Sequence, residues 1–218
     1  DLVEWVKKAR PHDPVWHPGE TPSVGIGQGA VNVNPLQLCV MCSRIANGKK
    51  ALYPRLVRSI GGVDQPPPGL VNGLTFAQEH MDFLHEAMIA VTTNGTAAGP
   101  NTDLNLGPIK MAGKTGTAQS HGYNGGIGAH GAQGAWNMRD HAWFIAFAPA
   151  DDPRYAMSVL TEHGGFGAGA SAPKAREIMR VALLKDPEVR ARIEQPVPSA
   201  APPATPTTSA ASNAASAT

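Results

Sequence analysis

The residues best suited to chemistry lie in one short run, Lys114-Thr115-Gly116-Thr117. An ammonium and two hydroxyls can together bind a carboxylate, and the backbone N–H of Thr117 can face a developing oxyanion. Gly116 has no side chain, so a peptide can lie against the run and pair with it as an added strand. The run therefore predicts substrate binding and oxyanion stabilisation rather than nucleophilic attack. An ordinary edge strand with an exposed lysine is the alternative that these four residues leave open.

The run must be held by a strand, because an apolar segment leads into it. Side chains alternate along a strand, so Thr115 and Thr117 should project to one face and Lys114 to the other, from which a local twist can bring the ammonium to the edge. Apolar runs and turn residues predict strands at 109–118, 141–148 and 155–161. The last two segments, with a turn between them, predict a hairpin.

Helical periodicity and capping residues predict helices within 1–22, at 35–46, from 75 to 94 and at 171–184. Asn34 is the expected N-cap of the second helix, with Pro35 at its first position. Ser171 is the expected N-cap of the last helix, whose buried side would comprise Ile178, Val181 and Ala182. Strands and helices together predict a mixed fold, of the α/β (α+β) class.

The length of 218 residues and a hydrophobic content of 42% predict one folded unit. Within it we expect a strand at 55–60, a loop at 61–69 and a long mobile loop in the glycine-rich segment 120–140. Residues 195–218 contain Pro, Ala, Ser and Thr with almost no other residue types and no charge, which is typical of disorder. We therefore divide the chain into a folded part, 1–194, and a disordered tail, 195–218.

Composition excludes several classes of function. The net charge is only +1, and the Lys and Arg residues do not cluster in the sequence, so nucleic acid is not an expected partner. Cys39 and Cys42 lie in an apolar helical pattern that favours core packing over redox or zinc chemistry. His121, His130 and His141 lack ligand-like spacing, so we expect solvated loop histidines and no metal site. We expect no cofactor, since the Gly-x-Gly-x-x-Ala pattern at 25–30 has no ribose-binding carboxylate downstream.

Other motifs accompany the Lys-Thr-Gly run in a definite order. They are Trp5, Lys7, Trp16, Gly-Glu-Thr at 19–21, Val-Gly-Ile-Gly-Gln-Gly at 24–29, Asn-Pro-Leu-Gln at 34–37, Asn-Gly-Thr-Ala at 94–97, the apolar stretch at 141–149 and Glu-His-Gly-Gly at 162–165. Together with residues 113–119, they resemble the transpeptidase domain of class B penicillin-binding proteins, the elongation-type enzymes above all. The resemblance covers most of the chain.

The resemblance implies part of a penicillin-binding/β-lactamase-like transpeptidase domain, in which an antiparallel sheet flanked by helices carries Lys-Thr-Gly on one strand. It implies a periplasmic D,D-transpeptidase that crosslinks peptidoglycan stem peptides ending in D-Ala-D-Ala and is acylated by β-lactams, with an elongation-complex glycosyltransferase as a further partner. Lys114 would be catalytic through its charge and hydrogen bonds. Thr115 and Thr117, with Gly116, would bind the substrate and its terminal carboxylate, and the Thr117 N–H would be one oxyanion donor. The tether to the inner membrane would be an N-terminal anchor outside this sequence.

A nucleophile is the element of the family pattern that we do not expect in this chain. The family places Ser-x-x-Lys and Ser-x-Asn well before the Gly-Ile-Gly-Gln-Gly segment, and neither motif occurs in the 24 residues before Gly25. The single Ser-x-x-Lys, at 171–174, follows the Lys-Thr-Gly run, where helix capping explains Ser171. With Asp1 read as an internal position of a longer protein, the chain is predicted to be a C-terminal fragment that is inactive alone.

Two alternatives remain open. One is a fragment of a serine β-lactamase or D,D-carboxypeptidase, and the other is a noncatalytic wall-binding or scaffold module. We also expect an apolar sheet face, around Trp143, Ile145 and Phe147 or around Phe144, to be exposed because the covering helices would belong to the absent segment.

Overall fold

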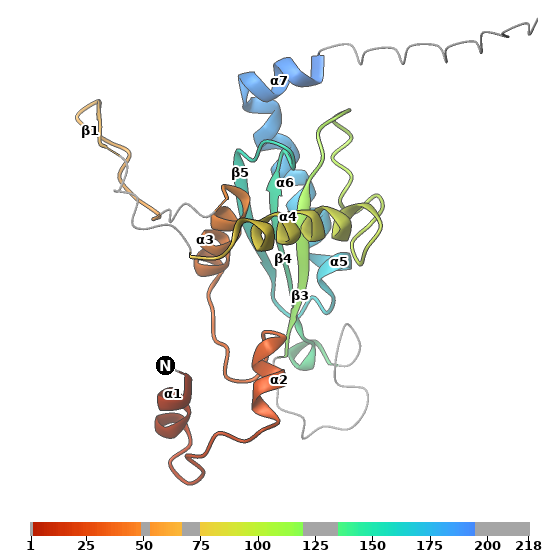
Figure 1. The fold of residues 1–218 in the computed structure, drawn as a ribbon. Coiled ribbons are helices and arrows are strands. Elements are labelled where there is room, and N and C mark those ends of the chain that lie inside the picture. The colour runs from red at the N-terminus through yellow and green to blue at the C-terminus, as the bar shows by residue number, and fades with distance from the viewer. Residues whose placement is uncertain (1, 49–52, 67–74, 120–134, 195–218) are drawn as a thin grey trace, which may run out of the picture.

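The computed structural model describes residues 2–48, 53–66, 75–119 and 135–194 (Figure 1). Its main sheet has three antiparallel strands in the order β3 (Ala112–Ala118), β4 (His141–Ala148) and β5 (Tyr155–Thr161). The helices are α1 (Leu2–Ala9), α2 (Glu20–Gly25), α3 (Pro35–Ala46), α4 (Gln78–Thr93), α5 (Gly167–Ala170), α6 (Ala172–Lys185) and α7 (Pro187–Glu194), with a 3-10 turn at Trp136–Met138. The predicted sheet and the mixed fold class are confirmed.

Helices of this chain cover both faces of the sheet. Phe147 and Ile145 of β4 pack with Met88 of α4 and Cys42 of α3 on one face. On the other face Phe144 packs against α6. These three β4 side chains are buried and Trp143 is half-buried, so the expectation of an exposed apolar face around them was wrong. The described part of the chain supplies its own cover on each side.

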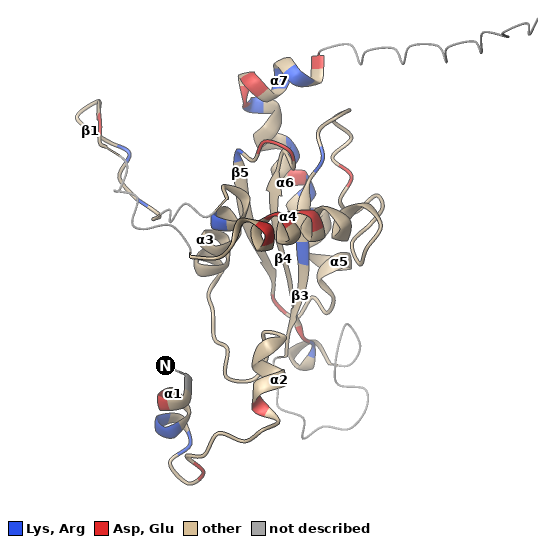
Figure 2. Cartoon of the chain, in the orientation of Figure 1, with Lys and Arg blue, Asp and Glu red and all other residues tan. Residues whose placement is uncertain are grey.

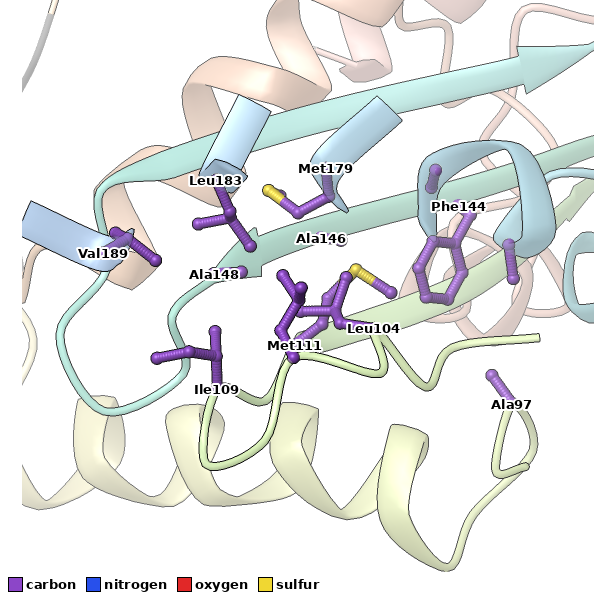
Figure 3. Close-up of a cluster of buried hydrophobic side chains, with 13 residues drawn as sticks. Ala97, Leu104, Ile109, Met111, Phe144, Ala146, Ala148, Met179, Leu183 and Val189 are labelled. Carbon is purple, nitrogen blue, oxygen red and sulfur yellow. The ribbon is translucent and has the colours of Figure 1, made fainter. Parts of the chain in front are cut away.

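The larger core cluster joins α6, β4 and the segment that leads into β3. Figure 3 shows Met179 and Leu183 of α6 lying against β4, with Ile109 and Met111 on the neighbouring segment. The buried residues of α6 are Ala172, Ala175, Met179 and Leu183. The expected buried side was therefore wrong, since Ile178 and Val181 are 56% and 49% exposed. Positions 172, 175, 179 and 183 form an i, i+3, i+7, i+11 stripe, whose two alanines allow α6 to approach the sheet closely.

Capping explains where α3 begins. The Asn34 side chain accepts the Gln37 amide N–H, and the Gln37 side chain accepts the Asn34 N–H, both at 2.9 Å. This is a reciprocal capping box, and Pro35 occupies the first turn, where a missing N–H costs nothing. Gly48 follows with φ +68°. Both predicted ends of α3 are confirmed.

Other predicted boundaries need correction. The helix expected from residue 75 begins at Gln78, and no side chain caps it at Ala77. Within the described residues 55–66, the chain forms a hairpin of two short strands, β1 (Ser59–Ile60) and β2 (Val63–Asp64), in place of the strand expected at 55–60 and the start of the loop expected at 61–69. Gly61 and Gly62 both have positive φ and make its turn. Residues 67–74, 120–134 and the tail 195–218 lie outside the described residues.

Charged residues of both signs are interspersed along the described elements (Figure 2). One cluster of polar contacts joins Asp186, the residue before α7, to the start of β5. Asp186 accepts hydrogen bonds from Arg154 at 2.8 Å, from Tyr155 at 3.0 Å and from the Val189 N–H at 3.3 Å. Desolvation raises the pKa of Asp186, but these hydrogen bonds outweigh it and hold the pKa below its ordinary value.

We predict an acid-sensitive contribution to stability from Asp186. Because the folded-state pKa is lowered, this contribution is complete above the unfolded pKa of about 3.9 and is lost as pH falls through the folded pKa. The Asp186→Asn protein should therefore show a shallower fall in unfolding temperature between pH 5 and pH 3 than the parent. The same change at exposed Asp64 serves as the control. Parallel melting curves for Asp186→Asn and the parent would contradict the prediction.

Cys42 is fully buried and behaves as a core residue. Burial and the neighbouring Cys39 raise its pKa to about 12. At pH 8 only about one Cys42 side chain in ten thousand should be a reactive thiolate. We predict that iodoacetamide leaves Cys42 unmodified in the native protein and alkylates it in guanidinium chloride, as read by peptide mass spectrometry. Native alkylation at the denatured rate would contradict this placement.

Candidate functional site

Lys114, Thr115, Gly116 and Thr117 lie together on β3, which has a paired neighbour on one side only. Thr115 pairs with Phe144, and Gly116 pairs with Trp143. Directly paired residues share a face, so the two threonines lie on the α6 side of the sheet and Lys114 lies on the α3 and α4 side. The predicted alternation of faces is confirmed. The edge of β3 that does not meet β4 is called the free edge below.

The free edge offers backbone groups for pairing. The carbonyl of Thr115 accepts the Lys114 ammonium at 2.8 Å, and the carbonyl of Thr117 accepts the Gln28 side-chain amide at 2.6 Å. In an antiparallel strand the N–H and C=O of one residue point to the same side. The N–H groups of Thr115 and Thr117 therefore also face the free edge. A peptide added there would meet alternating donors and acceptors.

Two polar groups lie close to the Thr115 hydroxyl. The Thr96 hydroxyl lies 3.3 Å from it, and the Lys114 ammonium lies 3.5 Å from it. The lysine thus bends around the strand, as the predicted local twist allows. Lys114 and Thr96 are both exposed, so their charge and hydroxyl are open to a ligand. An ammonium beside two hydroxyls suits a carboxylate.

Thr96 is placed by the end of α4. The Thr92 hydroxyl of α4 donates to the carbonyl of Met111, just before β3, at 2.6 Å. After the helix ends, Thr102 closes the following turn by donating to the Ala97 carbonyl at 2.6 Å. These two bonds hold residues 94–97 beside the strand. The Thr96 hydroxyl therefore reaches Thr115 from an ordered loop.

A close backbone contact fixes α5 against the middle of the run. A Cβ added at Gly167 would lie 2.2 Å from the Trp143 carbonyl oxygen and 2.9 Å from the Gly116 carbonyl oxygen. No side chain fits there. The turn before α5 is tied to the start of β4, because the His163 N–H donates to His141 Nδ1 at 2.9 Å and the Gly165 N–H donates to the Asp140 carbonyl at 2.8 Å.

Ser171 precedes α6, but its side chain does not cap the helix. It is fully buried, and its hydroxyl donates to the Ala142 carbonyl at 2.8 Å and contacts the Thr161 hydroxyl at 3.0 Å. Lys174 donates to the Ala170 carbonyl at 2.7 Å, and its ammonium lies 3.3 Å from the Thr161 hydroxyl. This Ser-x-x-Lys sequence joins α6 to the sheet and does not open onto the free edge.

The structure adds two residues to those that the sequence assigns to the site, Thr96 and Gln28. Thr96 and Gln28 lie in two of the motifs that resemble the family, at 94–97 and 24–29. The hydrophobic periodicity of the sequence does not indicate a role for either residue. Among the described residues, no group of three or more His, Cys, Asp or Glu could hold a metal ion, while His121 and His130 lie outside them. No helix in the described ranges has the length and apolar character to cross a membrane.

Lys-Thr-Gly on the edge strand of a helix-covered antiparallel sheet is one of the three motifs that penicillin-binding proteins and class A β-lactamases share. Residues 9–180 match the penicillin-binding protein transpeptidase domain family, and the chain belongs to that family. Within it, the chain is 37% identical over 186 residues to the peptidoglycan D,D-transpeptidase MrdA of Acinetobacter baumannii, and 34% identical over 165 residues to the peptidoglycan D,D-transpeptidase PbpA of Mycolicibacterium smegmatis. The expected resemblance to elongation-type enzymes is confirmed.

Solved structures agree. The fold is similar to that of Pseudomonas aeruginosa PBP2 in complex with WCK 5153, with a TM-score of 0.67 and 32% identity over 89% of this chain and 39% of that one. It is also similar to penicillin-binding protein A of Mycobacterium tuberculosis as an imipenem acyl-enzyme, with a TM-score of 0.58 and 27% identity over 78% of this chain and 35% of that one. The sequence matches span 83% and 72% of this chain but only 26% of MrdA and 31% of PbpA. The chain corresponds to part of such a protein.

Proposed function

We propose that this chain is the C-terminal part of a D,D-transpeptidase that crosslinks peptidoglycan stem peptides by serine acyl transfer. The observation that carries the proposal is the free edge of β3. There the Lys114 ammonium and the Thr96 hydroxyl meet the Thr115 hydroxyl, and the backbone of Thr117 faces outward. The family match and the similarity to MrdA support the same reaction.

In this proposal the stem peptide adds to β3 as a further strand. Lys114 and the threonine hydroxyls hold its terminal carboxylate, and the Thr117 N–H stabilises the oxyanion that forms on the reacting D-Ala carbonyl. A serine attacks that carbonyl, the terminal D-Ala leaves with a proton, and an amine of a second stem peptide then takes the acyl group from the serine. Lys114, Thr115, Gly116 and Thr117 thus bind and polarise the acyl donor.

The attacking serine belongs, in this proposal, to a part of a longer protein outside these 218 residues. The buried, hydrogen-bonded hydroxyl of Ser171 supports this, because it has no access to a substrate on the free edge. We further propose that the longer protein is periplasmic, is tethered by an N-terminal anchor, works with an elongation-complex glycosyltransferase and is acylated by β-lactams. The match to the penicillin-binding family and the similarity to an imipenem acyl-enzyme structure support the β-lactam part of this proposal.

The test uses a longer protein that contains this sequence, with a peptide ending in D-Ala-D-Ala as donor and a free D-amino acid as acceptor. We expect release of D-Ala together with an exchanged peptide that carries the new D-amino acid. Release of D-Ala with only the shortened peptide would identify a D,D-carboxypeptidase. Hydrolysis of benzylpenicillin with rapid turnover would identify a β-lactamase, and absence of any acylation would favour a noncatalytic module.

A further inference from the structure

The side chain of Gln28 occupies a position that a peptide substrate would need. Its amide Nε2 donates to the Thr117 carbonyl at 2.6 Å, across 89 positions of the sequence, and the contact is partly buried. That carbonyl is an acceptor on the free edge of β3. An added strand pairs through such carbonyls, so the amide N–H of an acyl donor would be directed at the same oxygen. A carbonyl oxygen that already accepts a short hydrogen bond accepts a second N–H less strongly.

A compact turn holds Gln28 in this position. The Gln28 N–H donates to the Ser23 carbonyl at 2.8 Å, and the Gly27 N–H donates to the Val24 carbonyl at 2.9 Å, which fastens the turn to α2. The glycines on either side of Gln28 have φ of +78° and +64°. Positive φ is readily adopted only by glycine. The backbone around Gln28 is therefore preset to direct its side chain at β3.

We propose that Gln28 competes with the acyl donor for the Thr117 carbonyl and so sets which acyl donors the free edge accepts. An acyl donor whose amide N–H faces the Thr117 carbonyl must displace the Gln28 amide from that oxygen. A donor without an N–H at that position reacts without displacing it. Gln28 acts here as a specificity-determining residue, through a hydrogen bond that is broken before acylation. This inference rests on the proposed function.

The experiment measures second-order acylation rates on a longer protein that contains this sequence. Gln28→Met keeps the length of the side chain and removes its donor, and Gln28→Glu replaces the donor by an acceptor. Gln78→Met is the matched control, because Gln78 is exposed on α4 and donates to Asp82. Benzylpenicillin, whose side chain is joined through an amide N–H, is compared with imipenem, whose hydroxyethyl side chain has none.

We expect both Gln28 variants to react with benzylpenicillin about two- to tenfold faster than the parent, which corresponds to the net free energy of one hydrogen bond. Imipenem rates and the Gln78→Met rates should stay within about twofold of the parent. An unchanged or slower benzylpenicillin rate in both Gln28 variants, with a normally acylated parent, would overturn the competition. An equal increase in the acylation rate with both antibiotics would also overturn it. The substitutions would then have made the free edge more accessible to any acyl donor, whether or not it carries the amide N–H. A parent that neither antibiotic acylates refutes the proposed function, and this inference with it.

Discussion

Replacing Lys114 by alanine is expected to slow acylation by benzylpenicillin about 100-fold in a longer protein that contains this sequence. The Lys114 ammonium lies beside the Thr115 hydroxyl and is exposed at the free edge of β3. The ammonium is therefore placed to bind the carboxylate of an acyl donor. Its loss removes a charged donor that the two hydroxyls cannot replace. The rate is measured from a time course of covalent labelling with a fluorescent penicillin.

Lys110→Ala is the matched control for this prediction. Lys110 is also exposed and lies on the segment that leads into the same strand, but before the Lys-Thr-Gly run. Its replacement should leave the acylation rate within about twofold of the parent, since a surface substitution outside the site costs little. Similar losses for both lysines would point to a general electrostatic effect, and a normal rate for Lys114→Ala would remove Lys114 from the site.

Replacing Gly167 by alanine is expected to destabilise the protein by about 1–3 kcal/mol, with loss of acylation. The new methyl carbon would lie 2.2 Å from the Trp143 carbonyl oxygen and 2.9 Å from that of Gly116, both of them backbone atoms. Because the backbone cannot turn away as a side chain can, α5 must move off the sheet or β3 must shift. Either movement displaces the Lys-Thr-Gly run. Denaturant unfolding followed by circular dichroism measures the stability.

The same substitution two residues later should not destabilise the protein. Gly169 also lies in α5, but a Cβ added there meets nothing within 4 Å. Alanine is favoured over glycine in a helix by up to about 1 kcal/mol, so Gly169→Ala should be neutral or slightly stabilising. Equal destabilisation by the two variants would show that α5 is sensitive to any substitution, and the close contact with Gly116 would not be the cause.

Local chemistry made much of the fold predictable. Asn34 and Pro35 mark the start of α3 through side-chain and backbone preferences that act within four residues. The strands β4 and β5 follow from apolar runs on either side of an Asp-Asp-Pro turn. The Lys114-Thr115-Gly116-Thr117 run could be placed on a strand because an apolar segment precedes it. These signals depend on near neighbours in the sequence.

The parts that could not be predicted depend on distant neighbours. Gln28 reaches Thr117 across 89 positions, and Gly167 lies against Gly116 across 51 positions. Nothing within residues 24–29 specifies the strand that the glutamine meets. The buried side of α6 was misassigned because bulky Ile178 and Val181 favoured one face, while the alanines that allow close packing lie on the other. Local hydrophobicity could not reveal how close α6 lies to the sheet.

The central claim is that this chain binds and polarises the acyl donor while the attacking serine lies elsewhere in a longer protein. Peptide mass mapping after reaction with benzylpenicillin tests it most directly. The account predicts a single penicilloyl adduct per longer protein, on a serine outside these 218 residues, and none on this chain incubated alone. An adduct on Ser171, or on any other residue of this sequence, would contradict it.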